Sequence, residues 1–365
     1  MATDEAMDRA YLDRALGLAD RGWGVTFPNP MVGAVVVRDG EIVGQGWHAG
    51  FGDAHAEVVA LADAGDRARG TTLYVTLEPC RHFGKQPPCT SAIVAAGVAR
   101  VVVASPDPDP IAGGGAAVLR AAGIVVEVGL QQARAAGRNF RFMHRFKSMD
   151  RPFVAIKLAV SMDGRIADAA GVSQWVSGDA ARQWVQWLRA GFGAIGVGAA
   201  TAIIDNARLT VRGALQPRLT PRRVIFDRRG TLPVDHVVFQ EIGTAPVTVL
   251  IGNGVASERR RELAAAGADL VVADTLVEGL RALGEQGVDS VLVEGGGRLA
   301  GALLREKLVD RVYQIQSPLW LGDGKPAWGG LGSPAIDAVP RWRLNNVRIL
   351  AEPGESGDVL IELEP

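Results

Sequence analysis

Apolar residues recur along the first part of the chain in an order that predicts alternating helices and strands. Residues 5–20 carry apolar side chains at helical spacing, which predicts an amphipathic helix. The stretches MVGAVVVR and EIVGQGWH flank Asp39-Gly40, a dipeptide favoured in tight turns, so we expect a β-hairpin. Helix patterns then separate three apolar runs, TLYVTLE, RVVVAS and IVVEV. Strands separated by helices predict a mainly parallel sheet covered on both faces.

A second series of strands and helices begins at Pro152. The stretch 129–151 breaks the earlier alternation and is rich in arginine, so we place a domain junction there, between domains 1–147 and 151–365. Helices are predicted at 179–189 and 258–266, among others. The predicted strands are FVAIKLAV, AIGVG, RRVIFD, VTVLI, DLVVA, SVLVE and RVYQIQ. The sequence therefore predicts a two-domain α/β protein.

The composition narrows the range of partners. Hydrophobic residues make up 48% of the chain and charged residues 22%, with a formal net charge of -1, which is typical of a globular protein. Because a nucleic-acid binder normally shows a basic excess, no nucleic-acid partner is expected. The N-terminus lacks the basic and apolar regions of a secretory signal, and no apolar run approaches the about 20 residues of a membrane span. We therefore predict a cytoplasmic protein without a membrane partner.

One histidine and the two cysteines of the chain suggest a metal site in the first domain. His55 and Cys89 each stand at the predicted start of a helix, and Cys80 lies nine residues before Cys89. Residues that lead adjacent helices at one sheet edge converge, so these three can share one zinc ion and leave a tetrahedral position open for water. Zinc lowers the pKa of such a water, and Glu57 can carry its proton to a departing nitrogen. The pattern predicts a zinc-activated hydrolase that removes an amino group from a nitrogen heterocycle.

Other interpretations of these residues stay open. His82 lies between the two cysteines and could supply a fourth ligand, which would make the zinc site structural. Alternatively, His55 is a core histidine and both cysteines are buried apolar residues. His48 could line the pocket, or it could only pack at the end of the hairpin.

The motifs of the first domain resemble the pyrimidine deaminases of the riboflavin pathway. The resemblance rests on NPMVGAVVVRDGEIVGQGWH, then HAE, then EPCRHFGKQPPC, whose cysteines are farther apart than the two-residue spacing usual in cytidine and tRNA-adenosine deaminases. It implies a cytidine-deaminase-like three-layer α/β domain. The site residues that it implies are the zinc ligands His55, Cys80 and Cys89, the proton carrier Glu57 and the pocket residue Asn29. Asp109 and Gly114 depart from the family, which often has Asn and a basic residue there.

Two glycine-rich stretches of the second half have different interpretations. Residues 191–196 match GxGxxG only formally, because they follow a predicted helix and lead into a strand. In SVLVEGGGRLAGALL, by contrast, a buried strand ends at Glu294 and a helix begins after the glycines, so backbone amides there could bind a phosphate. A tight turn without a ligand remains an alternative for this triple glycine.

The second half resembles the reductase part of the bifunctional deaminase-reductases of riboflavin biosynthesis. The matching segments are FVAIKLAVSMDGRIADAAGVSQWVSG, LRAGFGAIGVGAATAIIDNARLTVRG and VLVEGGGRLAGALL. They imply a C-terminal dihydrofolate-reductase-like α/β domain that uses NADPH. The implied NADPH contacts are Ala159, Trp175, Thr201, Asp205, Gly296, Gly297, Arg298, Leu299, Ala300, Gly301 and Ala302. The implied substrate contacts are Ser173, Arg189, Leu209, Arg212 and Glu294.

Taken singly, some of these residues have plainer explanations. Arg189 and Arg212 could be surface residues, and Trp175 could belong to the core. Asn206-Ala207 also departs from the Asp-Pro that commonly follows Asp205 in the family.

The resemblance implies two consecutive reactions and two cofactors, Zn2+ and NADPH. A phosphorylated diaminopyrimidinone ribosylamine would be deaminated, and its ribose would then be reduced to a ribityl chain. The family also implies a homodimer through the reductase domain. Two alternatives remain: a zinc deaminase of nucleic-acid bases with an appended nucleotide-binding domain, and a second half that binds nucleotide without catalysis.

Overall fold

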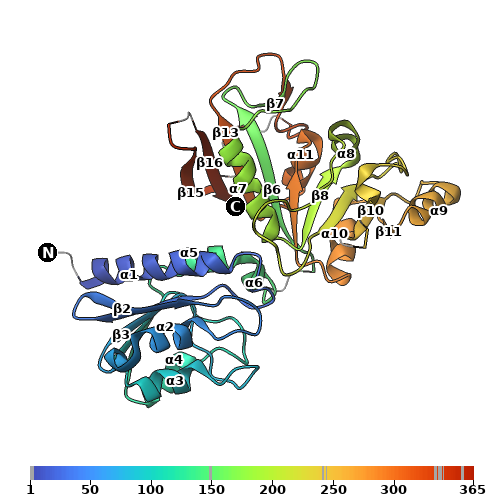
Figure 1. Ribbon diagram of the computed structural model, residues 1–365. Coiled ribbons are helices and arrows are strands. Elements are labelled where there is room, and N and C mark those ends of the chain that lie inside the picture. The colour runs from blue at the N-terminus through green and yellow to red at the C-terminus, as the bar shows by residue number, and fades with distance from the viewer. Residues whose placement is uncertain are drawn as a thin grey trace. The chain divides into compact units, whose positions relative to one another are not determined.

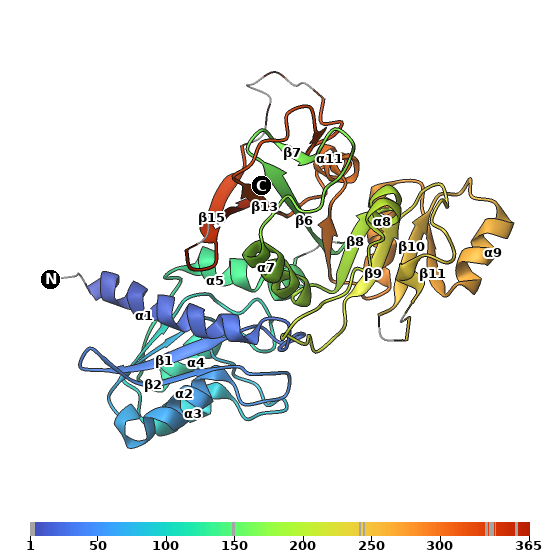
Figure 2. The same cartoon turned by 45° about the horizontal axis from the view of Figure 1, so that its top comes forward.

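The protein divides into two compact units, Met1–Ser148 and Met149–Pro365 (Figures 1 and 2). The structure is a computed structural model, and it describes residues 4–147, 150–240, 242–243, 245–332, 335, 339, 341–354 and 357–365. No helix within these ranges combines the length and the apolar character that a bilayer crossing requires.

The described residues of the N-terminal unit form a five-stranded sheet in the order β2-β1-β3-β4-β5. Its strands are β1 (Gly33–Arg38), β2 (Glu41–Trp47), β3 (Thr72–Val75), β4 (Arg100–Val103) and β5 (Val125–Val128). The predicted hairpin is confirmed, since β1 and β2 pair on either side of Asp39-Gly40.

The prediction of a mainly parallel sheet is wrong for half of this sheet. β3, β4 and β5 are parallel, but β1 runs antiparallel to both of its neighbours, β2 and β3. The helix between β2 and β3 does connect two parallel strands, as predicted. These strands are not adjacent, however, because β1 lies between them.

Helices cover both faces of this sheet, as Figure 1 shows. β1 illustrates the alternation that separates the two faces: Val35 and Val37 pack with α1, whereas Ala34 and Val36 pack with α2. On one face lie α1 (Asp4–Ala19) and α5 (Gln132–Arg138), and on the other α2 (Ala56–Ala64), α3 (Cys89–Ala96) and α4 (Gly115–Ala121). The short α6 (Phe140–His144) follows α5. The unit is therefore a three-layer α/β structure.

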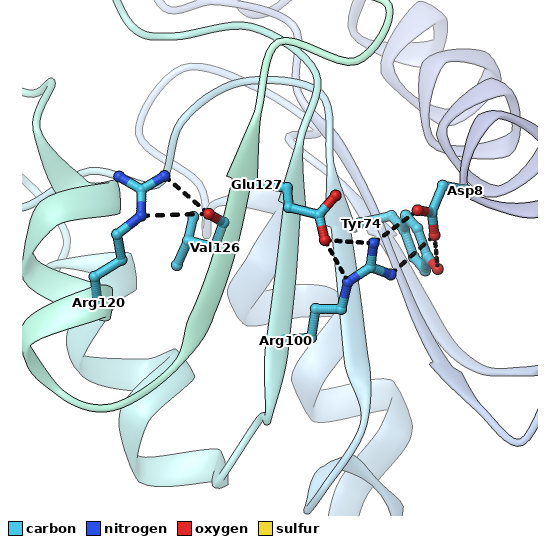
Figure 3. A network of polar contacts seen from close by, with 6 residues as sticks. All are labelled: Asp8, Tyr74, Arg100, Arg120, Val126 and Glu127. Atoms are coloured by element: carbon cyan, nitrogen blue, oxygen red, sulfur yellow. Dashed lines mark hydrogen bonds and ion pairs between the residues drawn. The ribbon is translucent and has the colours of Figure 1, made fainter. Parts of the chain in front are cut away.

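A buried ion pair fastens α1 to the sheet (Figure 3). The Asp8 carboxylate of α1 accepts hydrogen bonds from Tyr74 Oη on β3, at 2.6 Å, and from Arg100 Nη1 and Nη2 on β4, at 2.9 and 2.7 Å. Arg100 also donates to Glu127 on β5. One aspartate thus links a helix to adjacent strands through a network in which each charge has a partner.

The described residues of the C-terminal unit form a nine-stranded sheet and a separate two-stranded sheet. The order in the large sheet is β11-β10-β9-β8-β12-β6-β13-β16-β15. Seven of its strands were predicted from apolar runs: β6 (Phe153–Ser161), β8 (Ala194–Gly198), β9 (Arg222–Phe226), β10 (Val247–Ile251), β11 (Ala268–Val272), β12 (Ser290–Glu294) and β13 (Arg311–Ser317). They are all parallel to their neighbours within this set.

The remaining described strands of this unit were not predicted from the sequence. These are β15 (Arg343–Leu350) and β16 (Asp358–Glu364), which pair antiparallel at one edge of the sheet, and β7 (Arg165–Ala167) and β14 (Lys325–Pro326), which form the small sheet. β15 is exposed along almost its whole length, so it lacks the apolar run by which the buried strands were found.

Two hydrophobic clusters cover the two faces of the large sheet. One includes α10 (Leu276–Glu285) and α11 (Gly297–Arg305), and the other includes α8 (Ala199–Asp205) and α9 (Ser257–Ala265). The helix α7 (Asp179–Ala190) packs beside the second cluster, with Trp184 against the ring of Tyr313 on β13. Residues 191–196 follow α7 and lead into β8, which confirms that they are no dinucleotide fingerprint.

Candidate active sites

His55 and the two cysteines bring their ligand atoms together in the N-terminal unit. His55 precedes α2, Cys89 begins α3, and Cys80 lies in the segment between β3 and α3. His55 Nδ1 is 3.1 Å from Cys89 Sγ and 3.5 Å from Cys80 Sγ. The three atoms lie within 4.8 Å of one another, and His82 is not part of this group of potential metal ligands among the described residues. The alternative of a four-ligand site closed by His82 therefore has no support in the geometry.

The donor atoms fit zinc. One imidazole nitrogen and two sulfurs are a common zinc donor set, and three protein ligands leave one position free. The Cys89 side chain and the His55 ring lower the pKa of the Cys80 thiol to about 4, so Cys80 becomes a thiolate readily. The Cys89 backbone N–H also donates to Cys80 Sγ, at 3.3 Å. Both thiols are thus engaged in polar contacts, unlike two cysteines that merely fill a core.

Glu57 lies beside these ligands near the start of α2. Its side chain is buried, and burial raises the pKa of its carboxyl above the ordinary value. A carboxyl with a raised pKa can take up and release a proton near neutral pH. The environment of Glu57 therefore suits a proton carrier.

His48 and Asn29 form a polar pair next to the ring of His55. Asn29 Nδ2 is 3.1 Å from His48 Nε2, and His48 Nδ1 is 3.1 Å from the carbonyl oxygen of Ala54. Burial lowers the pKa of His48, which favours a neutral ring that donates to Ala54 and accepts from Asn29. The rings of His48 and His55 lie edge to face at 5.5 Å, so His48 belongs to the surroundings of the ligands rather than only to the end of the hairpin.

The C-terminal unit contains a cavity of about 2090 Å3. A pocket for one small ligand occupies roughly 300–1,000 Å3, so the cavity is large enough for a substrate together with a cofactor. It lies where the parallel strands β6, β12, β8 and β9 end, which is where ligands bind in open α/β sheets. All predicted substrate contacts line it: Ser173, Arg189, Leu209, Arg212 and Glu294.

Most of the predicted NADPH contacts line the same cavity, namely Ala159, Trp175, Thr201, Asp205, Gly296, Gly297, Arg298 and Leu299. Trp175 is 65% exposed, with the Arg182 guanidinium 4.6 Å from its ring centroid, so it is no core residue. Ala300, Gly301 and Ala302 lie farther along α11 and are not among the lining residues described, and a cofactor role for them stays a prediction.

Backbone contacts explain two glycines of α11. A Cβ atom at Gly297 would lie 2.7 Å from the carbonyl oxygens of Pro326 and Ala327, and one at Gly301 would lie 1.8 Å from that of Gly329. These glycines let the segment 326–329 cross the helix directly. Gly296, before the helix, has a φ of +77° and sits against Thr201. Gly296 and Gly297 line the cavity, and the binding of a phosphate by their backbone stays a prediction.

Arg189 and Glu294 form a buried, doubly hydrogen-bonded ion pair in this cavity. Arg189 Nε and Nη2 donate to the two carboxylate oxygens of Glu294 at 2.6 and 2.8 Å, and Nη1 donates to the Thr210 carbonyl oxygen at 2.8 Å. Burial alone would raise the pKa of Glu294, but the Arg189 charge and hydrogen bonds hold it below its ordinary value. Arg189 therefore orients Glu294, whereas Arg212 is exposed.

Lys157 is a candidate functional residue that was not predicted from the sequence. It lies on β6, directly opposite Glu294 on β12, and lines the cavity. Burial lowers the pKa of its ammonium group, although the charge of Glu294 opposes that shift. A signal was present in the sequence, since Lys157 is the one charged residue within FVAIKLAVS.

Comparisons with known proteins place both units in one family. Residues 5–105 match the cytidine and deoxycytidylate deaminase zinc-binding region, and residues 152–352 match the RibD C-terminal domain. The riboflavin biosynthesis protein RibD of Escherichia coli is 40% identical to the chain over 359 residues, which cover 93% of this chain and 96% of that protein. The chain belongs to the RibD family.

Other RibD proteins are similar over the same length. The Aquifex aeolicus protein is 38% identical, over 95% of this chain and 96% of its own. The structure of Acinetobacter baumannii RibD matches with a TM-score of 0.80 at 38% identity and covers 99% of both chains. The Thermotoga maritima deaminase/reductase matches with a TM-score of 0.79 at 36% identity and covers both chains completely.

RibD membership confirms the predicted fold class and the two-part enzyme. A cytidine-deaminase-like domain comes first and a dihydrofolate-reductase-like domain second, so the chain is a bifunctional deaminase and reductase of riboflavin biosynthesis. Zinc and NADPH are its cofactors, and His55, Cys80 and Cys89 are grouped as a zinc site requires. The alternative of a nucleic-acid base deaminase is correspondingly disfavoured.

Each departure from the common RibD pattern is accommodated by a local contact. The Asp109 carboxylate accepts from the Ile111 N–H at 2.8 Å, a turn contact that Asn could equally make. The Arg81 guanidinium lies over Gly114, where a Cβ atom would be 3.3 Å from Arg81 Nε. The Ala207 N–H donates to the Ala202 carbonyl oxygen at 3.1 Å, a hydrogen bond that proline cannot make.

Proposed function

We propose that the chain deaminates a phosphorylated diaminopyrimidinone ribosylamine and then reduces the ribose of the product to a ribityl chain. Residues 1–147 would perform the hydrolytic step and residues 151–365 the reduction. The observation that carries the proposal is the convergence of His55 Nδ1, Cys80 Sγ and Cys89 Sγ beside the buried Glu57. The cytoplasm as the place of action and a homodimer as the assembly remain parts of the proposal.

For the deamination, His55, Cys80 and Cys89 would hold zinc, which supplies a Lewis acid that makes water nucleophilic near neutral pH. Glu57 takes a proton from the attacking water and delivers it to the departing nitrogen. A C–O bond forms, the C–N bond breaks, and ammonia leaves. Asn29, which is half-buried, and the buried His48 lie beside the ligands, where they can orient the ring of the substrate.

For the reduction, the cavity would hold NADPH, whose chemistry when bound would be the donation of a hydride to the anomeric carbon of the ring-opened ribose. The turn from Gly296 to Leu299, with Ala159, Trp175, Thr201 and Asp205, would bind the cofactor. Ala300, Gly301 and Ala302 would act indirectly, by holding the start of α11 in place. The substrate would lie against Ser173, Arg189, Leu209, Arg212 and Glu294, with Arg212 directed to its phosphate.

Replacement of the proton carrier tests the deamination. We expect Glu57→Gln to retain zinc and to lose about 10²–10⁴-fold in the rate of ammonia release, which is the usual contribution of a positioned acid-base group. The amide keeps the size of the side chain but cannot carry the proton. Metal analysis measures zinc, and oxidation of NADPH with the deaminated intermediate reports an intact C-terminal unit.

Glu41→Gln is the matched control, because Glu41 is an exposed carboxylate of the same unit at the start of β2. It should deaminate at the wild-type rate. A Glu57→Gln enzyme with near wild-type deamination would remove Glu57 from the mechanism.

A further inference from the structure

A buried asparagine between α5 and α6 binds the backbone of a residue far away in the chain. The Asn139 side chain is 5% exposed, and its Oδ1 accepts from the Met31 N–H at 2.7 Å while its Nδ2 donates to the Met31 carbonyl oxygen at 2.8 Å. These are the two contacts that a neighbouring β-strand would make with Met31. Asn139 lies in the stretch 129–151, which the sequence marks only as a junction between domains. The deamination described above assigns it no role.

The segment that carries Asn29 depends on such outside support. A proline stands on either side of Asn29, and proline has no N–H to donate. The Asn29 N–H donates to the Thr26 carbonyl oxygen at 3.0 Å, which fixes the segment before Asn29. Beyond Asn29, the first backbone N–H is that of Met31, which donates to Asn139. Asn139 therefore holds the side of the segment that leads into β1.

Two arginines of the same region hold the other side of the segment. The guanidinium carbon of Arg141, on α6, lies 3.5 Å from the centroid of the Phe27 ring. Arg145 directly follows α6, and its Nη1 donates to the Pro28 carbonyl oxygen at 3.0 Å. The residues on both sides of Asn29 thus contact α6 or a residue next to it.

The held segment meets the zinc-site residues through His48. The His48 backbone N–H donates to the Val32 carbonyl oxygen at 2.9 Å, and its ring Nε2 is 3.1 Å from Asn29 Nδ2. The other ring nitrogen, Nδ1, is 3.1 Å from the carbonyl oxygen of Ala54, the residue before the proposed ligand His55. A displacement of the segment would therefore move Asn29 and His48 relative to the ligands.

We propose that Asn139 is a positioning residue of the deaminase, which fixes the Met31 backbone and so holds Asn29 and His48 in the orientation that the substrate ring requires. The proposal rests on the deamination proposed above for the N-terminal unit. Asparagine suits the task because its side-chain amide offers the same acceptor and donor as a peptide group. The stretch 129–151 then contributes to the deaminase site and is more than a connection between domains.

Removal of the side-chain amide tests the proposal. Asn139→Ala deletes both hydrogen bonds to Met31, and we expect kcat for ammonia release to fall about 10- to 100-fold, because a misplacement of about 1 Å can cost that much. The KM should change by less than about threefold, since a misplaced ring still binds but is seldom aligned with the attacking water. Metal analysis should find the wild-type zinc content.

A double-mutant cycle with Asn29→Ala separates a positioning role from a merely structural one. If Asn139 acts through Asn29, then Asn139→Ala should lower kcat by less than about threefold once Asn29 is alanine. Effects that are independent of each other would instead multiply in the double variant.

Asp8→Asn is the matched control, because it also removes buried hydrogen bonds from the N-terminal unit, between α1 and the strands β3 and β4. It should lower the resistance to urea and leave the kcat of the folded enzyme at the wild-type value. Asn139→Asp is the second variant should Asn139→Ala unfold, since it keeps the acceptor for the Met31 N–H and loses only the donor. It should lower kcat and show the same dependence on Asn29.

Three results would overturn the proposal: a wild-type kcat in a folded Asn139 variant, a loss that appears in KM alone, and losses that multiply in the double variant. A wild-type enzyme that releases no ammonia from the diamino substrate would instead refute the proposed deamination itself. That failure would be visible before any residue is replaced.

Discussion

The Asp8 carboxylate shows how much one buried charge can contribute to the stability of a folded unit. It is almost fully buried, and its hydrogen bonds from Arg100 and Tyr74 join α1 to β3 and β4 (Figure 3). The hydrogen bonds from Arg100 hold the pKa of Asp8 below its ordinary value, although burial opposes this shift. Removal of the charge would leave Arg100 with only Glu127 as an acidic partner.

We expect Asp8→Asn to destabilise the N-terminal unit by about 2–3 kcal/mol at pH 7, because a buried charged group loses its partner. Since the folded pKa of Asp8 is depressed, its stabilisation is complete above the ordinary aspartate pKa and disappears as the pH falls through the lowered value. The difference between wild type and variant should therefore shrink in acid. The midpoint of urea inactivation of the deaminase measures the effect.

The control is Asp13→Asn, in which an exposed aspartate of the same helix loses its ion pair with Arg134. This change should cost less than about 1 kcal/mol. An equal loss of stability in the two variants would mean that the hydrogen bonds of Asp8 stabilise the unit no more than an exposed ion pair does.

The chemistry of individual residues also determines which site residues can be predicted from the sequence. His55, Cys80 and Cys89 were predicted because few residue types bind zinc, and the structure brings their ligand atoms together. Lys157 was missed, although it is the one charged residue of FVAIKLAVS, because its position opposite Glu294 across the strand pair is not visible in a single sequence.

At the scale of elements, α11 needs glycine at the positions where the segment 326–329 crosses it. The segment 326–329 approaches so closely that a Cβ atom at Gly301 would lie 1.8 Å from the Gly329 carbonyl oxygen. The backbone must shift to admit any side chain there, and such overpacking usually costs about 1–3 kcal/mol.

We expect Gly301→Ala to destabilise the C-terminal unit by at least this amount and to weaken NADPH binding, because the Gly296 turn leads into α11. Gly284→Ala on α10 should have the opposite effect on stability. A Cβ atom there meets its nearest neighbours at an ordinary 3.5 Å, so the gain in helix propensity, up to about 1 kcal/mol, remains. The urea concentration that abolishes NADPH oxidation measures the stability of each variant. A loss of stability in Gly284→Ala as large as that in Gly301→Ala would contradict this explanation.

The elements predicted from the sequence are those whose burial requires a recognisable pattern of apolar residues. β6, β8 to β13 and the hairpin were found because their side chains alternate or run apolar against covering helices. β15 was missed because all its residues except Leu350 are exposed. The position of β1 between β2 and β3 was not predictable either, since strand order depends on contacts between segments distant in the chain.

At the scale of the whole molecule, we propose that a second copy of the chain binds at β15. It is an edge strand of the large sheet, and its apolar side chains Leu344, Val347 and Ile349 are 58%, 51% and 72% exposed. Val347 and Ile349 pair with Ile361 and Val359 on β16, which extends the apolar face. Such a surface is typical of an interface between subunits.

We expect a dimer in solution, with about twice the 38.4 kDa of one chain by light scattering. Ile349→Glu should dissociate it, because a buried charge without a partner is costly in an interface. Val125→Glu, at an exposed valine on the edge strand β5, serves as the control and should remain dimeric. A monomeric wild type, or a dimer that survives Ile349→Glu, would contradict the proposed assembly.

The hydrophobic clusters described for the two sheets each draw their members from one unit. A substitution that destabilises the core of one unit therefore need not inactivate the other unit. Two damaged alleles of the gene, one defective in each half, could then complement each other in a single cell, provided that the intermediate diffuses between the two defective enzymes.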